Sequence, residues 1–421
     1  MRDPSTEPHE EPMGEIDEIC AQQLTLNPFR PGAGHMPLYL AGREDEKKQF
    51  TKLLKQSLIL ENLVLTGLRG LGKTVLLETF KPMAVNAGWL WAGTDLSESA
   101  SITEVNLATR ILADLAVVTS SLTTGVEYHN SIGLVTSTER IETRLDHQAL
   151  VRVFAETPGL TADKLKQVLE TVWMYLSKVD KRGIIFAYDE AQNLADHKAR
   201  HEFPLSLLLD VFQSIQKKGI PFMLALTGLP TLLPKLVQAR TFAERMFTVV
   251  SLDPLNEEDT ALAISIPTKS HSIQFSSESI QGIWGITHGY PYFIQYICRE
   301  TYDVWLQAVI DGGTPGFVPI EDILRKLDTD FFAGRWAKAT DRQRQLLAII
   351  AELRDGEGEF TPQEIVEHDE NQDQEKPFSA SHVNQLLSAL TDAGLIYKNR
   401  HGKYCFAVPL MGGFIKRQIA N

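Results

Sequence analysis

The sequence predicts an α/β fold built on a parallel sheet, followed by an all-helical part and a small C-terminal domain. Three observations lead to this prediction. An apolar run at 63–66 breaks into a glycine-rich turn, and a helical pattern begins directly after it. A second apolar run at 183–188 starts at a glycine and ends in two acids, which is typical of a buried parallel strand. Beyond about residue 335, helical patterns are followed by two strand-like runs joined by a basic turn.

The glycine-rich turn has the pattern of a phosphate-binding loop. In G-x-x-x-x-G-K-[ST] the glycines let the backbone wrap a phosphate closely, and successive N–H groups point at the anion where a helix begins. We expect Lys73 to supply a charge for the outer phosphates and Thr74 a hydroxyl ligand for Mg²⁺. The residues expected to bind the nucleotide here are Gly67, Leu68, Arg69, Gly70, Leu71, Gly72, Lys73, Thr74 and Val75.

Acidic and hydroxyl side chains follow two further predicted strands. Asp189 and Glu190 come directly after the run at 183–188, and Thr227 follows the apolar run at 221–226. Because chemistry in open α/β sheets lies at the carboxyl ends of the strands, Asp189 is expected to hold the metal, directly or through water. Glu190 is expected to orient an attacking water, and Thr227 to sense the outer phosphate or orient that water.

The segments between these strands are predicted to be helical. Between about residues 93 and 180 we expect helices, low order at 119–138 and no strand. Past a strand at 248–252, short helices with clear start signals are expected to form a lid on the nucleotide. Arg240 and Arg245 are candidates for reaching a phosphate across a subunit boundary, and the alternative is a solvated basic helix face.

The composition is that of a water-soluble protein in a reducing cytoplasm. Of 421 residues, 43% are hydrophobic and 23% charged, and no apolar run approaches the roughly 20 residues of a membrane span. Residues 1–25 form an acidic stretch that we expect to be disordered, without the pattern of a secretory signal. Cys20, Cys298 and Cys405 lack disulfide or metal spacing. The net charge of −13 argues against indiscriminate coating of nucleic acid but not against a local basic patch.

Three helices followed by a hairpin is the winged-helix arrangement, which we predict for residues 335–421. In such domains the third helix usually enters the major groove of DNA and the wing contacts the backbone. The third helix expected here, 379–392, carries no Lys or Arg, so a domain used for protein contacts stays an alternative. The charges available for phosphate contacts are Lys398, Arg400, Lys403, Lys416 and Arg417.

With these residues in place the chain resembles the AAA+ ATPases, in the branch that joins origin-recognition-like ATPases with STAND signalling ATPases. The loop 67–74 matches the Walker A motif of that family, and 188–192 matches its Walker B motif. Gly42-Arg43-Glu44 looks like the family motif that lies near the adenine, so Arg43 joins the expected nucleotide-binding residues. Gly289-Tyr290-Pro291 looks like the lid signature of STAND ATPases, which adds Pro291.

The resemblance implies a three-layer αβα P-loop core at 26–252, a helical lid at 253–334 and the winged helix beyond it. It also implies a chain that binds and hydrolyses ATP with Mg²⁺, releases ADP and forms a homo-oligomer. Thr227 falls at the sensor position, and Arg245 is similar to the arginine that completes a neighbour's site. The winged helix would engage DNA or a DNA-bound complex. The alternative is a regulatory switch that turns over slowly and binds a partner protein.

Overall fold

A computed structural model describes residues 27–131, 137–353, 358–370, 377–400 and 402–420. The chain divides into two compact units. One, called the sheet unit below, comprises Arg43–Asp253 and Glu357–Val408. The other, called the helical unit, comprises Met1–Gly42, Pro254–Gly356 and Pro409–Asn421. The acidic stretch 1–25, which the sequence predicts to be disordered, lies outside the described residues.

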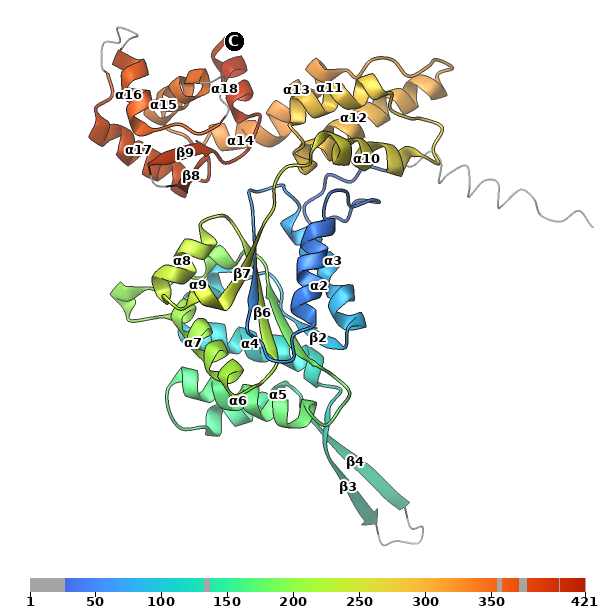
Figure 1. The fold of residues 1–421 in the computed structure, drawn as a ribbon, viewed down its shortest axis with the longest axis vertical. Coiled ribbons are helices and arrows are strands. Elements are labelled where there is room, and N and C mark those ends of the chain that lie inside the picture. Colours follow the sequence, from blue (N-terminus) through green and yellow to red (C-terminus); the bar gives the residue numbers. More distant parts are fainter. Residues whose placement is uncertain (1–26, 132–136, 354–357, 371–376, 401, 421) are drawn as a thin grey trace, which may run out of the picture. The chain divides into compact units, whose positions relative to one another are not determined.

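A five-stranded parallel sheet forms the centre of the sheet unit (Figure 1). The strand order is β2-β5-β6-β1-β7. Its strands are β1 (Asn62–Thr66), β2 (Trp89–Ala92), β5 (Gly183–Tyr188), β6 (Phe222–Gly228) and β7 (Phe247–Ser251). β1, β5 and β6 are buried along their whole lengths, because helices cover both faces of the sheet. The predicted α/β class with a parallel sheet is confirmed.

Helices pack on both faces of this sheet. Figure 1 shows α2 and α3 on one side and α7 and α8 on the other. Successive residues of a strand point to opposite faces, so Phe186 and Tyr188 of β5 join one hydrophobic core with the helices α4, α6 and α7. The helices of this unit are α2 (Glu44–Leu54), α3 (Lys73–Asn86), α4 (Glu104–Thr119), α5 (His147–Glu156), α6 (Thr161–Leu176), α7 (Pro204–Lys217), α8 (Leu232–Ala239) and α9 (Ala243–Met246).

The expectation of no strand between residues 93 and 180 is wrong. β3 (Thr123–Ser131) and β4 (Ser137–Arg144) pair as an antiparallel hairpin that extends beyond α5 and α6 in Figure 1. The two strands pair only with each other, so neither needs the apolar run by which a strand of the central sheet is recognised. Their mostly polar sequence therefore predicts an irregular segment.

Side-chain caps start two helices of the helical unit at positions that the sequence predicts. Asn256 accepts the N–H of Asp259 at 2.7 Å, and Ser276 accepts the N–H of Ser279 at 3.1 Å. Pro291 is the first residue of α12. The helices are α10 (Glu257–Thr268), α11 (Ser277–Thr287), α12 (Pro291–Ile310), α13 (Ile320–Leu327), a π-helical turn (Asp328–Phe332), α14 (Ala333–Trp336), α15 (Asp341–Glu352) and α18 (Met411–Ala420).

Two contacts within the helical unit tie the segment 27–42 and the helix α18 to its other helices. The Asn27 amide donates to the carbonyl O of Arg299 at 2.9 Å, which ties the segment 27–42 to α12. On α18, the Arg417 guanidinium binds both carboxylate oxygens of Asp328, at 2.7 and 2.6 Å. Arg417 is therefore engaged by a carboxylate rather than presented to a phosphate.

The remaining elements belong to the sheet unit and follow α15 along the chain. They are α16 (Pro362–Glu370), α17 (Ala380–Asp392) and the antiparallel strands β8 (Ile396–Arg400) and β9 (Lys403–Phe406). Phe360 also forms a bridge with Tyr404 of β9. The winged-helix domain itself stays a prediction. Among the described residues, none of the helices combines the length and apolar character that crossing a membrane requires.

Candidate nucleotide site

The sheet brings the sequence-predicted residues to one edge. β6 lies between β1 and β5, and the register pairs Leu65 with Thr227 and Tyr188 with Leu226. Because all these strands are parallel, their carboxyl ends meet at the same edge. Thr227 therefore lies between the loop that follows β1 and the acids that follow β5.

The loop 67–72 leads directly into α3, whose first residue is a buried lysine. Gly72 has a φ of 88°, in the left-handed region that glycine adopts without a steric penalty. Lys73 follows it, only 7% exposed, and its Nζ donates to the carbonyl O of Leu68 at 2.8 Å. Burial lowers the pKa of Lys73, although the nearby carboxylates oppose this shift. A bound anion would stabilise the charged form of this ammonium.

Thr74 and Asp189 are in direct contact. The Thr74 hydroxyl donates to Oδ2 of Asp189 at 2.5 Å, and Oδ1 of the same carboxylate accepts the N–H of Glu190 at 2.8 Å. Asp189 is 5% exposed, and burial raises its pKa above the usual value. The predicted metal residues are thus brought together as two adjacent oxygen donors.

Glu190 has an uncommon backbone conformation and an amide partner. Its φ of 51° lies in the left-handed region, which a non-glycine residue seldom adopts and which is enriched at functional sites. The side-chain amide of Gln192 donates to its carboxylate. The sequence predicts no role for Gln192, because nothing local shows which atoms its side chain would reach.

Two buried threonine hydroxyls at this edge have no hydrogen-bond partner among the described residues. They are Oγ1 of Thr227, at the end of β6, and Oγ1 of Thr66, at the end of β1. Thr227 is 0% exposed. Leaving such a group unsatisfied costs about 1–3 kcal/mol. A buried hydroxyl without a partner in a native fold therefore needs an explanation. Phosphate oxygens and water at this edge would supply the missing partners.

The donor set fits magnesium held together with a nucleotide. Within the described part of the chain, no group of three or more His, Cys, Asp or Glu residues could hold a metal ion. Mg²⁺ commonly keeps several waters and takes only one or two protein ligands beside substrate phosphates. The oxygens of Thr74 and Asp189 match that requirement.

The side chain of Arg43 bonds to the backbone of the phosphate loop. Its guanidinium is buried, and Nη2 donates to the carbonyl O of Leu71 at 3.1 Å and to that of Asp253 at 3.0 Å. These bonds tie the loop to the segment that follows β7. Contact of Arg43 with the adenine stays a prediction, as does the role of Pro291, which lies in the helical unit.

The structure separates the two arginine candidates. Arg240 binds Asp210 with two hydrogen bonds, at 2.7 and 2.6 Å, and also donates to Oγ of Ser206 at 2.8 Å. Its guanidinium is therefore engaged inside its own unit. Arg245 lies on the short helix α9 with its side chain exposed. Contact of Arg245 with a phosphate of a neighbouring subunit stays a prediction.

The basic residues of the hairpin β8–β9 differ in their surroundings. Lys398 is exposed, with its Nζ 5.9 Å from the centre of the Tyr404 ring. Lys403 lies 3.7 Å from a carboxylate oxygen of Glu359, which offsets part of its charge. The side chain of Arg400 lies outside the part of the chain that the structure describes.

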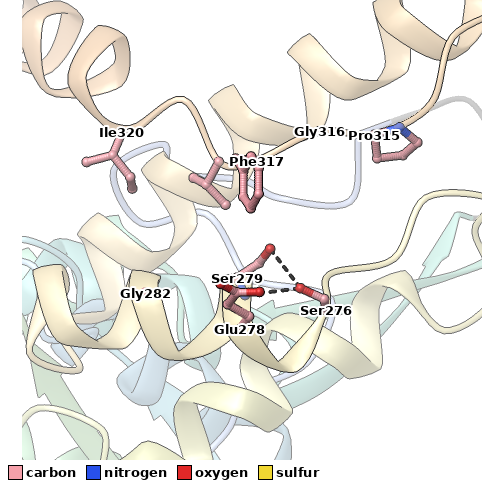
Figure 2. Close-up of a pocket in the computed structure, with 9 residues that line it drawn as sticks. Ser276, Glu278, Ser279, Gly282, Pro315, Gly316, Phe317 and Ile320 are labelled. Carbon is pink, nitrogen blue, oxygen red and sulfur yellow. Dashed lines mark hydrogen bonds between the residues drawn. The ribbon is translucent and has the colours of Figure 1, made fainter.

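A cavity of about 400 Å³ lies in the helical unit between α11 and the loop 315–320. Figure 2 shows Phe317 pointing across it toward Ser279, whose hydroxyl bonds to that of Ser276 at 3.0 Å. The cavity is lined by none of the sequence-predicted site residues. Its lining residues are Ser276, Glu278, Ser279, Gly282, Pro315, Gly316, Phe317, Val318 and Ile320.

Comparisons with known proteins bear on the fold. Residues 329–415 match a family described as a domain of unknown function (DUF8462). The search of curated proteins finds no match. The chain is similar to the Walker-type ATPase PABY2304 of Pyrococcus abyssi, with a TM-score of 0.55 at 15% identity over 90% of this chain and 96% of that chain.

Two further likenesses have lower scores. The ORC1 protein of Aeropyrum pernix, solved in complex with DNA, gives a TM-score of 0.46 at 14% identity over 91% of this chain and 94% of that chain. The RuvB Holliday junction branch migration motor of Thermotoga maritima gives 0.42 at 14% identity, over 87% and 92%. The likeness to the P. abyssi protein shows the fold. This chain therefore shares its overall fold with that protein.

Proposed function

We propose that this chain is a Mg²⁺-dependent AAA+ ATPase that oligomerises and engages DNA or a DNA-bound complex through a winged helix. The observation that carries the ATPase proposal is the contact between Thr74 and Asp189 beside the buried ammonium of Lys73. A hydroxyl, a carboxylate and a cation at one edge of a parallel sheet are what a magnesium triphosphate requires.

Each residue has a distinct part in the proposed reaction. Lys73 and the N–H groups of the loop bind the outer phosphates, and the hydroxyl of Thr227 bonds to a phosphate oxygen or to the attacking water. Glu190 orients that water, whose oxygen bonds to the outer phosphorus as the bond to the leaving ADP oxygen breaks. Thr74 and Asp189 would hold Mg²⁺, which supplies charge neutralisation at the phosphate oxygens.

The proposed oligomer rests on Arg245. An exposed guanidinium on α9 can reach the phosphates of a neighbouring protomer and stabilise the charge that develops in the transition state. This proposal predicts turnover that rises with protein concentration, because a single protomer lacks the cation.

The proposed DNA contact rests on the hairpin β8–β9. Lys398, Arg400 and Lys403 provide cations on a two-stranded hairpin that directly follows α17, and wings of this kind contact phosphates. The net charge of −13 limits such binding to a local patch.

A turnover assay tests the ATPase proposal. Phosphate release from Mg²⁺–ATP is measured for the wild-type chain and for Glu190→Gln, which keeps the shape of the side chain and removes its charge. We expect turnover to fall by about 100-fold while ATP still binds. Equal turnover in the two proteins would contradict the proposal.

A regulatory switch with slow turnover is the second candidate. Two observations favour it: the net charge of the chain is −13, and α17 carries no Lys or Arg. A switch would retain nucleotide through gel filtration and bind a partner protein without a salt-dependent affinity for DNA. An ATPase that engages DNA would release ADP between turnovers and lose DNA affinity steeply with salt.

A further inference from the structure

The side chain of Gln192 joins two parts of the candidate nucleotide site. Gln192 is 9% exposed and lies in the short helical turn Ala191–Asn193 that follows Glu190. Its Oε1 accepts the backbone N–H of Leu229 at 3.1 Å. Its Nε2 donates to Oε2 of Glu190. One amide therefore bridges the end of β6 and the carboxylate expected to orient water.

The chemistry of the two partners fixes the direction of this bridge. A backbone N–H can only donate and a carboxylate can only accept, so the amide oxygen must face Leu229 and the amide nitrogen must face Glu190. The opposite amide orientation would place donor against donor and acceptor against acceptor. Glutamine is thus the side chain of this length that satisfies both partners, and glutamate would set two carboxylates against each other.

The surroundings hold Gln192 in this place. The carbonyl O of Gln192 accepts from Nζ of Lys235 on α8 at 2.8 Å, and the N–H of Asn193 donates to the carbonyl O of Glu190 at 2.9 Å. Gly228 leaves the necessary space, since a Cβ there would lie 2.6 Å from Oε1 of Gln192. The side-chain amide of Gln192 therefore packs and bonds between the end of β6 and the turn after β5.

We propose that Gln192 is a positioning residue that orients Glu190 and couples it to the end of β6. The inference rests on the proposed ATPase function and deepens it. Gln192 holds one oxygen of the Glu190 carboxylate, so the other oxygen faces the attacking water in a defined direction. Leu229 lies two residues beyond Thr227, so a shift of the β6 end when Thr227 bonds to phosphate reaches Glu190 through the same amide.

Steady-state kinetics of full-length variants test this role. Gln192→Ala and the similarly sized apolar Gln192→Met are expected to lower kcat by about 10-fold or more, with the KM for ATP nearly unchanged. Gln192→Glu should lower kcat at least as far, because its carboxylate repels Glu190. Asn193→Ala is the matched control: the neighbouring amide donates to the carbonyl O of Leu96 at 2.9 Å instead, and kcat should stay near that of the wild type.

A double variant separates positioning from simple structural support. If Gln192 acts through Glu190, then Glu190→Gln combined with Gln192→Met should be no slower than Glu190→Gln alone, because residues that act as a unit are not additive. A further additive loss, or a Gln192→Met protein with wild-type or raised kcat, would overturn the inference. If wild type and Glu190→Gln hydrolyse ATP equally, the proposed ATPase function fails and this inference fails with it. An active wild type matched by Gln192→Met leaves the ATPase standing and removes only the inference.

Discussion

Thr74 and Asp189 are separated by 115 positions in the sequence, and the hydroxyl of one donates to the carboxylate of the other at 2.5 Å. The parallel sheet accounts for this contact, because β1 and β5 end at the same edge with only β6 between them. The contact assembles the oxygen donors expected to hold Mg²⁺. The proposals on metal binding, turnover and coupling depend on it.

Asp189 is expected to lower the stability of the ligand-free protein at neutral pH. Burial raises the pKa of Asp189 above 3.8, so folding favours the protonated carboxyl. The stability that the protonated carboxyl contributes is fully present below the pKa of the unfolded chain. It is lost as the pH rises through the pKa of the folded protein. Asp189→Asn removes the buried charge and should therefore unfold at an equal or higher temperature at pH 7. The gain should shrink as the pH approaches 4. Thermal unfolding over this pH range measures it, and a lower Tm for Asp189→Asn at pH 7 would contradict the argument.

Substitution of Arg240 is expected to lower stability, whereas substitution of Arg245 is expected to change turnover. Arg240→Ala leaves Asp210 without its two hydrogen bonds, and because both side chains are partly exposed the expected cost is about 1 kcal/mol of unfolding free energy. Arg245→Ala should leave stability unchanged and abolish the rise of turnover with protein concentration. Denaturant unfolding and phosphate release measure the two effects. A concentration dependence that survives Arg245→Ala would remove this residue from the neighbour's site.

Lys398 is expected to contribute to DNA affinity without regard to sequence. Each phosphate contact adds about 0.9 to the slope of log K against log salt, so Lys398→Ala should reduce the slope by about that amount. Lys81→Ala on α3 is the matched control, since that lysine is also exposed but lies outside the hairpin β8–β9. Titrations of duplex DNA at several salt concentrations decide the matter. Absent binding, or a slope that does not change, would favour a winged helix that contacts protein.

Much of the sheet and site could be predicted because the signals are local. The loop 67–74 and the acids after 183–188 carry their chemistry in adjacent residues, and parallel strands bring such ends to one edge. The starts of α10 and α11 could be predicted for the same reason, since Asn256 and Ser276 cap N–H groups only three residues away.

The features that sequence reasoning missed depend on tertiary neighbours. Arg240, the residue after α8, pairs with Asp210 on α7. The direction of the Gln192 amide depends on the backbone N–H of Leu229, which directly follows β6. The hairpin β3–β4 was missed because a ribbon that pairs only with itself lacks the apolar pattern of a buried strand. In each case the sequence does not show which residues meet in the folded chain.

Isothermal titration calorimetry with ATP, in the presence and absence of Mg²⁺, tests whether Thr74 and Asp189 form a magnesium triphosphate site. We predict saturable heat for the wild-type chain that weakens strongly without Mg²⁺, because Thr74 and Asp189 would hold the ion against the phosphates. Thr74→Ala should lose this Mg²⁺ dependence, and Lys73→Met should bind weakly in both conditions. Absence of heat with Mg²⁺–ATP, or binding by Thr74→Ala with the Mg²⁺ dependence of the wild type, would contradict the account.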